Sequence, residues 1–421
     1  MRWSLLRNRS FVLLWAAQIL STLGNELYNI GVMVTIFEET GSALQTAGVF
    51  VARMVPALIL GPAAGVIIDR YPRRLVLVGM NLAQALLLWA LLLAGGGETS
   101  STWSGYAIVI GLATAQTFYR PAQQAILPDI VSRAELVRAN SLMMSTNQAI
   151  LMASYAVGGV LILQYGTQLL VIISLATYLV GAAATVLIVA PERPATAEVD
   201  RPDVGFLRAV WDGLVYVRDH PLARPLVVME TFEHWPHGIW ISALMLVFTR
   251  EALQAGTQAW GYQGAAFFAG QLAGALVAVF VAERLARRAG WVIIGSAFLY
   301  GVLTLAYAVS PTVLFAVFVS FVFGPPSAIR DVTQDALLQA TASPELMGRV
   351  YATRDTLARI SFMLAGVAFA WLADQVSVRW VYLIGGVMYV GTALYALSSA
   401  AIRHSRIRDG ETDALAGPTS P

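Results

Sequence analysis

Two residue types are missing from this chain of 421 residues: it has no cysteine and no lysine. Without cysteine the chain has no disulfide, no thiolate metal site and no cysteine nucleophile. Without lysine it has no phosphate-binding loop of the GxxxxGK[ST] type, because that motif needs a lysine before its Ser or Thr. ATP-driven pumping through that motif is therefore excluded within this chain.

Charge of either sign is also scarce. Only 12% of the residues are charged and 57% are hydrophobic, with a mean hydropathy of +0.67. A soluble domain carries about 25% charged residues. A chain this apolar needs lipid as the solvent for much of its surface, and long apolar runs cross lipid as helices. The composition therefore predicts an all-α membrane protein.

Twelve apolar runs reach the length of about 20 residues that a helix needs to cross a bilayer. The first follows a basic start, but it is too long for the core of a signal peptide and lacks a cleavage site. We therefore expect it to remain as the first helix. The twelve runs lie at 11–37, 44–68, 75–95, 104–127, 139–163, 168–190, 225–248, 260–282, 291–309, 313–336, 350–373 and 380–402.

The arginines predict the orientation, and they account for all 27 basic residues. With a cytoplasmic N-terminus and alternating crossings, 20 arginines fall in cytoplasmic segments and only Arg250 and Arg379 lie outside. This asymmetry follows the positive-inside rule. We therefore expect a multi-pass protein of the cytoplasmic membrane with both termini inside. Because the arginines follow topology and form no separate patch, we expect no binding of nucleic acid.

One long polar break, residues 191–221, divides the runs into six and six. Its first part is rich in proline, alanine and charge and is typical of a linker. Residues 205–218 have apolar side chains at helical spacing, which predicts an amphipathic helix on the inner membrane face. The predicted division is a six-helix half (1–190), the linker (191–221), a second six-helix half (222–403) and a disordered tail (404–421).

The two halves carry the same landmarks. The frame acid-Arg-x-x-Arg-Arg occurs as DRYPRR from Asp69 and as ERLARR from Glu283. At a similar offset of about 210 residues, Arg330 follows Arg120 and PELMGRV follows AELVRAN, which indicates duplication of a six-helix unit. One large class of secondary transporters is built in this way, with the substrate site at mid-membrane between the halves.

The stretch GVIIDRYPRR resembles the signature loop of the major facilitator superfamily, which runs Gly-x-x-x-Asp-Arg-x-Gly-Arg-Arg between helices two and three. The chain departs from it at Pro72. The matching residues are Gly65, Asp69, Arg70, Arg73 and Arg74. A second block, RPAQQAILPDIVSRAELVRANSL, resembles the branch of drug exporters that includes macrolide efflux proteins. A Gly-Pro-x-x-Gly-Gly pattern of many drug–proton antiporters is matched only at Gly158 and Gly159.

This resemblance implies a role for the repeated charged loop as a latch on the inner side. In the family the acid, here Asp69, meets the start of helix eleven near Gly348, and the arginine four residues on, here Arg73, meets an acid at the end of helix four, here Asp129. The alternative is that the arginines only fix topology. The second copy, with Glu283, Arg284, Arg287 and Arg288, is interpreted as a weaker latch or a topological anchor.

Ionisable side chains inside the membrane are costly and mark candidate functional sites. Glu26 lies near the middle of the first helix, beside the polar residues Asn25 and Tyr28. One interpretation is a carboxylate that carries protons or recognises a cation. The other is a carboxylate that is hydrogen-bonded within a helix interface.

The seventh helix carries a denser group, METFEHWPHGIW. Glu230, Glu233, His234 and His237 recur at spacings of three and four, so most of them share one helix face. Pro236 should kink the helix. A proton relay or a polar wall of the substrate cavity is the functional interpretation; an interhelical network and a Glu/His/His metal site are the alternatives. We expect no metal and no cofactor.

Five further ionisable residues complete the candidate cavity: Arg120, Arg330, Asp331, Asp355 and Arg359. Asp355 and Arg359 have the i,i+4 spacing of a helical ion pair. The arginines either contact an anionic group of the substrate or are balanced by internal acids, and we favour internal balance.

The sequence therefore predicts a secondary transporter that functions as a monomer and exports amphipathic small molecules in exchange for protons. A siderophore or other natural-product exporter and a lysophospholipid transporter are alternatives of the same class. A membrane-embedded enzyme and a non-transporting sensor are alternatives of other classes, and no GxSxG or HExxH motif supports an enzyme.

Overall fold

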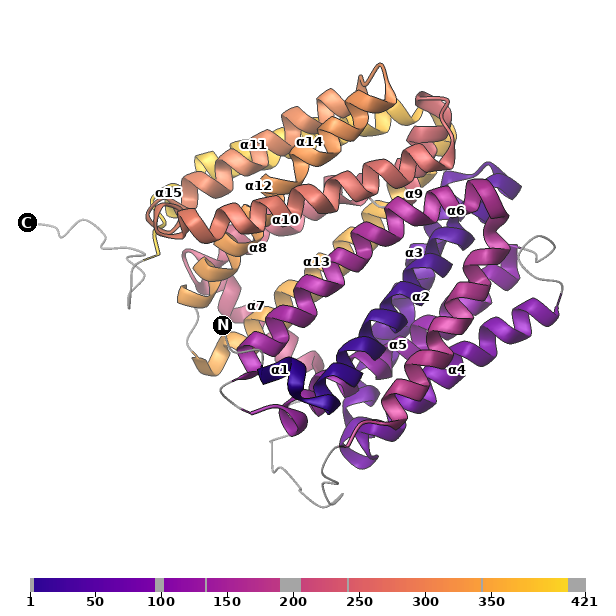
Figure 1. Ribbon diagram of the computed structural model, residues 1–421. Helices are drawn as coiled ribbons and strands as arrows, with labels where there is room; N and C mark the ends of the chain where they lie inside the picture. Colours follow the sequence, from indigo (N-terminus) through magenta and orange to yellow (C-terminus); the bar gives the residue numbers. More distant parts are fainter. Residues whose placement is uncertain are drawn as a thin grey trace, which may run out of the picture. The chain divides into compact units, whose positions relative to one another are not determined.

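A computed structural model describes residues 4–94, 102–132, 135–189, 206–240, 242–341 and 344–407 (Figure 1). The chain divides into two compact units. Unit 1 comprises Met1–Arg201 and Gly256–Ala265, and unit 2 comprises Pro202–Ala255 and Ala266–Pro421. The described residues form helices and no strands, as the sequence predicts for an all-α protein.

Unit 1 is built on long helices with clear local stop and start signals. Asn8 accepts a hydrogen bond from the Phe11 amide at the start of the second helix, and Ser42 does the same for Gln45 at the start of the third. Gly41 ends the second helix at φ 62°, the left-handed conformation that glycine adopts readily. The helices are α1 (Ser4–Arg7), α2 (Arg9–Thr40), α3 (Ala43–Arg70), α4 (Arg73–Leu93), α5 (Thr102–Ile130) and α6 (Leu136–Val186).

Helix α6 is two segments joined at a break. Gly166 has φ 74° and ψ 176°, outside the helical region. The sequence predicts two separate runs here, 139–163 and 168–190, and Gly166 lies between them. Each side of the break is long enough to cross a membrane.

Unit 2 contains an interrupted helix at the expected place. Helix α8 (Ala223–His237) passes into a 3₁₀ turn, Gly238–Trp240, one residue after Pro236. A short helix α9 (Ser242–Val247) and a π turn, Phe248–Ala252, complete the run. The remaining helices are α7 (Phe206–Asp219), α10 (Thr257–Arg287, which begins in unit 1), α11 (Ala289–Ala308), α12 (Val313–Thr341), α13 (Pro344–Gln375), α14 (Val378–Ser398) and α15 (Ala400–Arg403).

Seven helices of the described chain combine the length and the apolar composition needed to cross a membrane: α3, α4, α6, α11, α12, α13 and α14. The α6 span alone covers Arg138–Val186. Each of the twelve predicted runs falls on helical segments, but the count of twelve crossings and the cytoplasmic location of the termini stay predictions.

The two units each have a tightly packed core. In unit 1, α2 packs along α6, and α4 packs against α5 and α6. Gly24 makes the α2–α6 contact possible, because a Cβ there would overlap the Thr177 hydroxyl. In unit 2, buried aromatic side chains of α11, α12 and α14 pack together: Tyr300 stacks on Phe323, and Tyr389 meets both rings edge to face.

Helix α7 is the helix predicted within residues 205–218. It packs on α13 and α8: its Asp212 accepts a hydrogen bond of 2.9 Å from Arg349, and its Val217 is buried against Val350 and Val227. Trp211 is 66% exposed. Its placement on the inner membrane face stays a prediction.

Candidate functional site

The candidate site is best described as three groups of paired charges within the helices, one in unit 1 and two in unit 2. In unit 1, Nη2 of Arg53 on α3 lies 3.0 Å from Oε1 of Glu26 on α2. Asn25 donates a second hydrogen bond, of 3.2 Å, to the same oxygen. The Glu26 side chain is only 9% exposed, whereas the Arg53 side chain is 34% exposed. The pair is therefore half open to its surroundings.

In unit 2, Glu233 of α8 forms an ion pair with Arg330 of α12. The two side chains are 2% and 4% exposed, so this pair is sealed within the unit. The Arg330 guanidinium also lies over the ring of Tyr300, 5.5 Å from its centroid. A face-on ring attracts a cation, which adds to the stabilisation of the buried charge.

Arg354 of α13 organises the third group. Its Nε lies 2.9 and 2.7 Å from the two carboxylate oxygens of Glu230. Its Nη1 donates to Asp335 of α12 over 2.5 Å. The amide of Gln334 donates to Glu230 over 2.8 Å. One arginine thus joins α8, α12 and α13 through charge-assisted hydrogen bonds, which are stronger than neutral ones.

The two histidines of α8 are held mainly by their own helix and by aromatic rings. Nδ1 of His234 lies 2.7 Å from the Glu230 carbonyl, and Nδ1 of His237 lies 3.3 Å from the Glu233 carbonyl. His237 Nδ1 is also 2.9 Å from the Tyr389 hydroxyl. The two rings stack with centroids 5.9 Å apart. In the described chain, neither imidazole is recorded hydrogen-bonding a carboxylate, and no three metal-type ligands gather to hold a metal ion.

Four of the predicted cavity residues are exposed: Arg120, Asp331, Asp355 and Arg359. A charged side chain at membrane depth faces water or a polar partner rather than lipid, so we expect these positions of α5, α12 and α13 to face a polar environment. Among the described residues there is no ion pair between Asp355 and Arg359, although their i,i+4 spacing allows one. The neighbouring Arg354 turns inward to Glu230 instead.

Tyr28 does not join the Glu26 pair. Its ring is 2% exposed and lines a separate pocket between α2, α4, α5 and α6. The sequence placed it with Glu26 because the two residues are neighbours in the chain. On a helix, however, positions i and i+2 point in different directions.

The predicted latch loop shows one of its expected contacts. Nη1 of Arg73 lies 2.6 Å from Oδ2 of Asp129 and 2.7 Å from the Ala125 carbonyl. Arg74 donates to the Ile188 carbonyl over 3.1 Å. All these contacts lie inside unit 1. They fasten the start of α4 to the end of α5 and to the segment after α6.

The other latch residues give no further contacts to describe. The side chains of Asp69 and Glu283, and position Gly65, lie outside the described residues, as does the side of α13 near Gly348. All four of the remaining arginines, Arg70, Arg284, Arg287 and Arg288, are exposed at or next to the ends of their helices. The role of these residues as a latch stays a prediction.

Four residues of the three groups are absent from the predicted cavity: Arg53, Arg354, Gln334 and Asp335. The signal for Arg53 was present. Helices α2 and α3 are joined by the tight turn at Gly41 and Ser42, and residues equidistant from such a turn face each other. This places Arg53 about one helical turn from the level of Glu26. No comparable local signal joins Arg354 to Glu230, because they belong to helices far apart in the sequence.

Comparison with known proteins assigns the chain to a family of carriers. A family model described as transmembrane secretion effector matches residues 1–417. The chain is 27% identical to the MFS-type transporter YjbB of Bacillus subtilis over 413 residues, covering 95% of this chain and 98% of that protein. It is 21% identical to macrolide efflux protein A of Streptococcus pyogenes over 389 residues, covering 91% and 94%.

Solved structures share the fold at low sequence identity. The nucleoside transporter NupG superposes with a TM-score of 0.71 at 12% identity, covering 92% of this chain and 98% of that one. A D-xylose–proton symporter superposes with a TM-score of 0.66 at 14% identity, covering 92% and 97%. The relatives and fold neighbours are transporters and not enzymes. The chain therefore belongs to the transmembrane secretion effector family of major facilitator superfamily transporters.

Proposed function

We propose that this transporter exports amphipathic small molecules in exchange for protons, by alternating access between two six-helix halves in the cytoplasmic membrane. The likeness to macrolide efflux protein A supports export of amphipathic compounds. In this proposal both termini are cytoplasmic and one chain is the working unit.

The observation that carries the proposal is the ion pair between Glu26 and Arg53. Their atoms are 3.0 Å apart, and one partner is buried while the other is one-third exposed. Water that enters on the exposed side of Arg53 would carry protons to the carboxylate. The carboxylate is nevertheless held among buried groups of α2, where a change of charge is felt strongly.

Protonation of Glu26 switches the interaction. A neutral carboxyl group no longer attracts Arg53, so the guanidinium is released toward its exposed side. Asn25 can keep a hydrogen bond to the carboxyl group in both states. The pair is thus a two-state element of the kind that conformational coupling requires. A cationic or polar group of the substrate would compete with Arg53 for the ionised carboxylate.

Glu233 is the second candidate for coupling, with His234 and His237 as the proposed relay. Its pair with Arg330 is sealed in the described arrangement. For Glu233 to exchange protons, α8 and α12 must separate during the cycle. We therefore assign first place to Glu26.

The test is transport into inverted vesicles with an imposed pH gradient. A radiolabelled macrolide is the first probe, followed by other amphipathic small molecules. Wild-type protein should accumulate the probe against its gradient and return it chemically unchanged. Glu26→Gln, which mimics the protonated form, should lose accumulation driven by the pH gradient but keep exchange down a concentration gradient.

Glu38→Gln is the matched control, because it makes the same chemical change at an exposed position of the same helix. It should accumulate the probe as the wild type does. If Glu26→Gln and Glu233→Gln both retain full accumulation driven by the pH gradient, these carboxylates do not couple the proton. The exposed acids Asp331 and Asp355 then become the candidates.

A further inference from the structure

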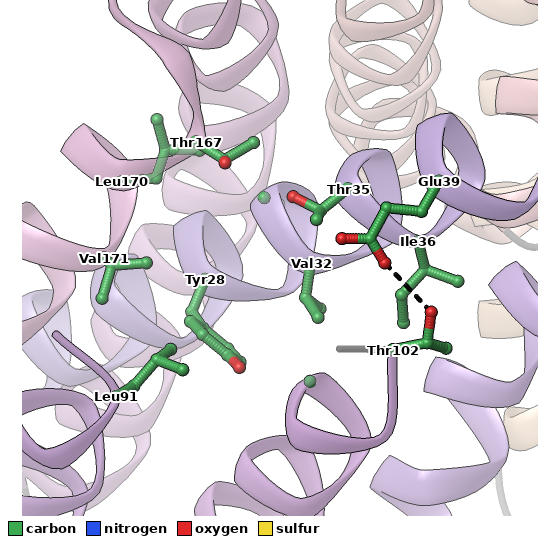
Figure 2. Close-up of a pocket in the computed structure, with 12 residues that line it drawn as sticks. Tyr28, Val32, Thr35, Ile36, Glu39, Leu91, Thr102, Thr167, Leu170 and Val171 are labelled. Atoms are coloured by element: carbon green, nitrogen blue, oxygen red, sulfur yellow. Dashed lines mark hydrogen bonds between the residues drawn. The ribbon is translucent and has the colours of Figure 1, made fainter. Parts of the chain in front are cut away.

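A cavity lies within unit 1 and is lined by neither Glu26 nor Arg53. It runs between α2, α4, α5 and α6 and holds about 400 Å³ of empty space, its open mouth included. Figure 2 shows its lining side chains, with Glu39 and Thr102 hydrogen-bonded to each other. The lining includes Tyr28, Gly31, Val32, Glu39, Leu170 and Val171.

The cavity is long and narrow. Tyr28 and Glu39 both belong to α2, and a helix rises 1.5 Å per residue, so the two positions are about 16 Å apart along the axis. The cavity volume includes the open mouth, so over that length the mean cross-section of the enclosed part is below about 25 Å². Carbon atoms in contact lie about 4 Å apart, so this section excludes a fused or large ring and leaves a single hydrocarbon chain as the widest occupant.

The two ends of the cavity differ in chemistry. At one end, Glu39 is exposed and accepts a hydrogen bond of 3.0 Å from Thr102. At the other end, the Tyr28 side chain is 2% exposed. The walls between the two ends are mostly aliphatic.

The missing side chains at Gly31 and Gly105 leave the space open. A Cβ at Gly105 would lie 3.0 Å from Val32, which is closer than normal packing. A Cβ at Gly31 would lie 3.7 Å from Leu170, an ordinary contact. The gap beside Gly31 is therefore room that a small side chain would fill without strain.

We propose that this cavity binds a single-chain amphiphilic cation, with its alkyl chain along the aliphatic walls and its cationic head at Glu39. Among the described lining residues, Glu39 is the only ionisable side chain apart from the Tyr28 phenol, so charge complementarity selects a cation over an anion. The alkyl chain gains contact with Val32, Leu170 and Val171. The site does not depend on the proposed transport function, because its ligand can bind without being carried.

The absence of cysteine from the chain makes a direct test possible. Thr35→Cys places one thiol in the wall of the cavity with little change of volume. The full-length variant is placed in nanodiscs of zwitterionic lipid, and the rate of modification by a neutral thiosulfonate reagent is measured. Dodecyltrimethylammonium is the probe, and dodecyl sulfate is the matched anion of the same chain length.

We expect the cation to slow modification of the thiol at concentrations at which the anion does not. Adding Glu39→Gln should abolish this protection, because the glutamine keeps the hydrogen bond to Thr102 but removes the charge. Adding Glu38→Gln, which removes one charge from the neighbouring position outside the cavity, should leave the protection in place.

Three results would overturn the proposal. Equal protection by the cation and the anion would indicate unspecific partition into lipid. Protection that survives Glu39→Gln would place the head group elsewhere. A thiol that the reagent never modifies would show that the cavity is closed to ligands.

Discussion

The Glu26–Arg53 pair of unit 1 and the Glu233–Arg330 pair of unit 2 have the same chemistry and opposite surroundings. The first has one partner 34% exposed, and the second has no side chain more than 4% exposed. The exposed side of Arg53 leaves the guanidinium room to move away when the carboxylate becomes neutral. No such outlet exists for Arg330 among the described residues, because it lies between Glu233 and the ring of Tyr300.

This difference separates two roles that the same residues can have in a membrane. A sealed pair is costly to break, because removal of one partner leaves an uncompensated charge in a medium of low dielectric constant. A half-open pair costs little to break and can follow the protonation state of its carboxylate. We therefore expect the unit 2 pairs to hold the bundle together and the unit 1 pair to switch.

The largest effect is expected for Glu233→Gln. The neutral amide leaves Arg330 charged and buried, so the free energy of unfolding should fall by about 3–5 kcal/mol. It can be measured by denaturation in mixed micelles at fixed detergent composition. The double variant Glu233→Gln/Arg330→Gln is the control and should recover most of the loss, because it removes the unpaired charge. A single variant as stable as the wild type would contradict a sealed pair.

The sequence predicts the positions of the helices better than it predicts which charged side chains pair with one another. The run predicted at 44–68 became α3, Ala43–Arg70, because long apolar runs have few alternatives in lipid. The run predicted at 225–248 is broken after His237, as Pro236 suggested. The presence of a charge in an apolar run is a local signal. Its partner depends on which helices become neighbours.

Arg354 is an example of a charged residue whose partner could not be predicted from the sequence. The sequence places it beside Asp355, and the i,i+4 rule draws attention to Asp355 and Arg359. The structure turns Arg354 toward Glu230, 124 positions earlier in the chain. Its guanidinium reaches that carboxylate only because α8 and α13 pack together in unit 2. Composition and spacing along one helix contain no information about this contact.

An intermediate effect is expected for Arg354→Gln. Its loss leaves Glu230 without its bidentate partner and Asp335 without a charged donor. Because hydrogen bonds to charged groups contribute about 1.5–3 kcal/mol, we expect a loss of about 2 kcal/mol in the same unfolding assay. Gln334 still donates to Glu230, which limits the damage.

Arg359→Gln is the matched control for this variant, since Arg359 is exposed on the same helix. It should change the unfolding free energy by less than about 0.5 kcal/mol. Equal losses in the two variants would mean that the contacts of Arg354 contribute nothing beyond its charge.

A smaller effect is expected for the ion pair between Arg73 and Asp129. Asp129→Asn removes the ion pair but leaves the hydrogen bond from Arg73 to the Ala125 carbonyl. With Arg73 22% exposed, we expect a loss of about 1 kcal/mol. Asp219→Asn removes an ion pair with Arg218 at the exposed end of α7 and is the control, with no measurable change expected. A large loss of unfolding free energy in Asp129→Asn would contradict this estimate and show that the Arg73–Asp129 ion pair contributes strongly to the stability of unit 1.

The smallest stability effect should come from Glu26→Gln, although the same change is proposed to abolish pH-driven export. Arg53 can extend its charged end along its exposed side without leaving α3. The loss of unfolding free energy should therefore be about 1 kcal/mol or less, in the same assay as Glu233→Gln. A loss as large as that of Glu233→Gln would mean that both pairs are sealed once lipid surrounds the chain. In that case any transport defect of Glu26→Gln would follow from a damaged fold, and the assignment of switching to unit 1 would fail.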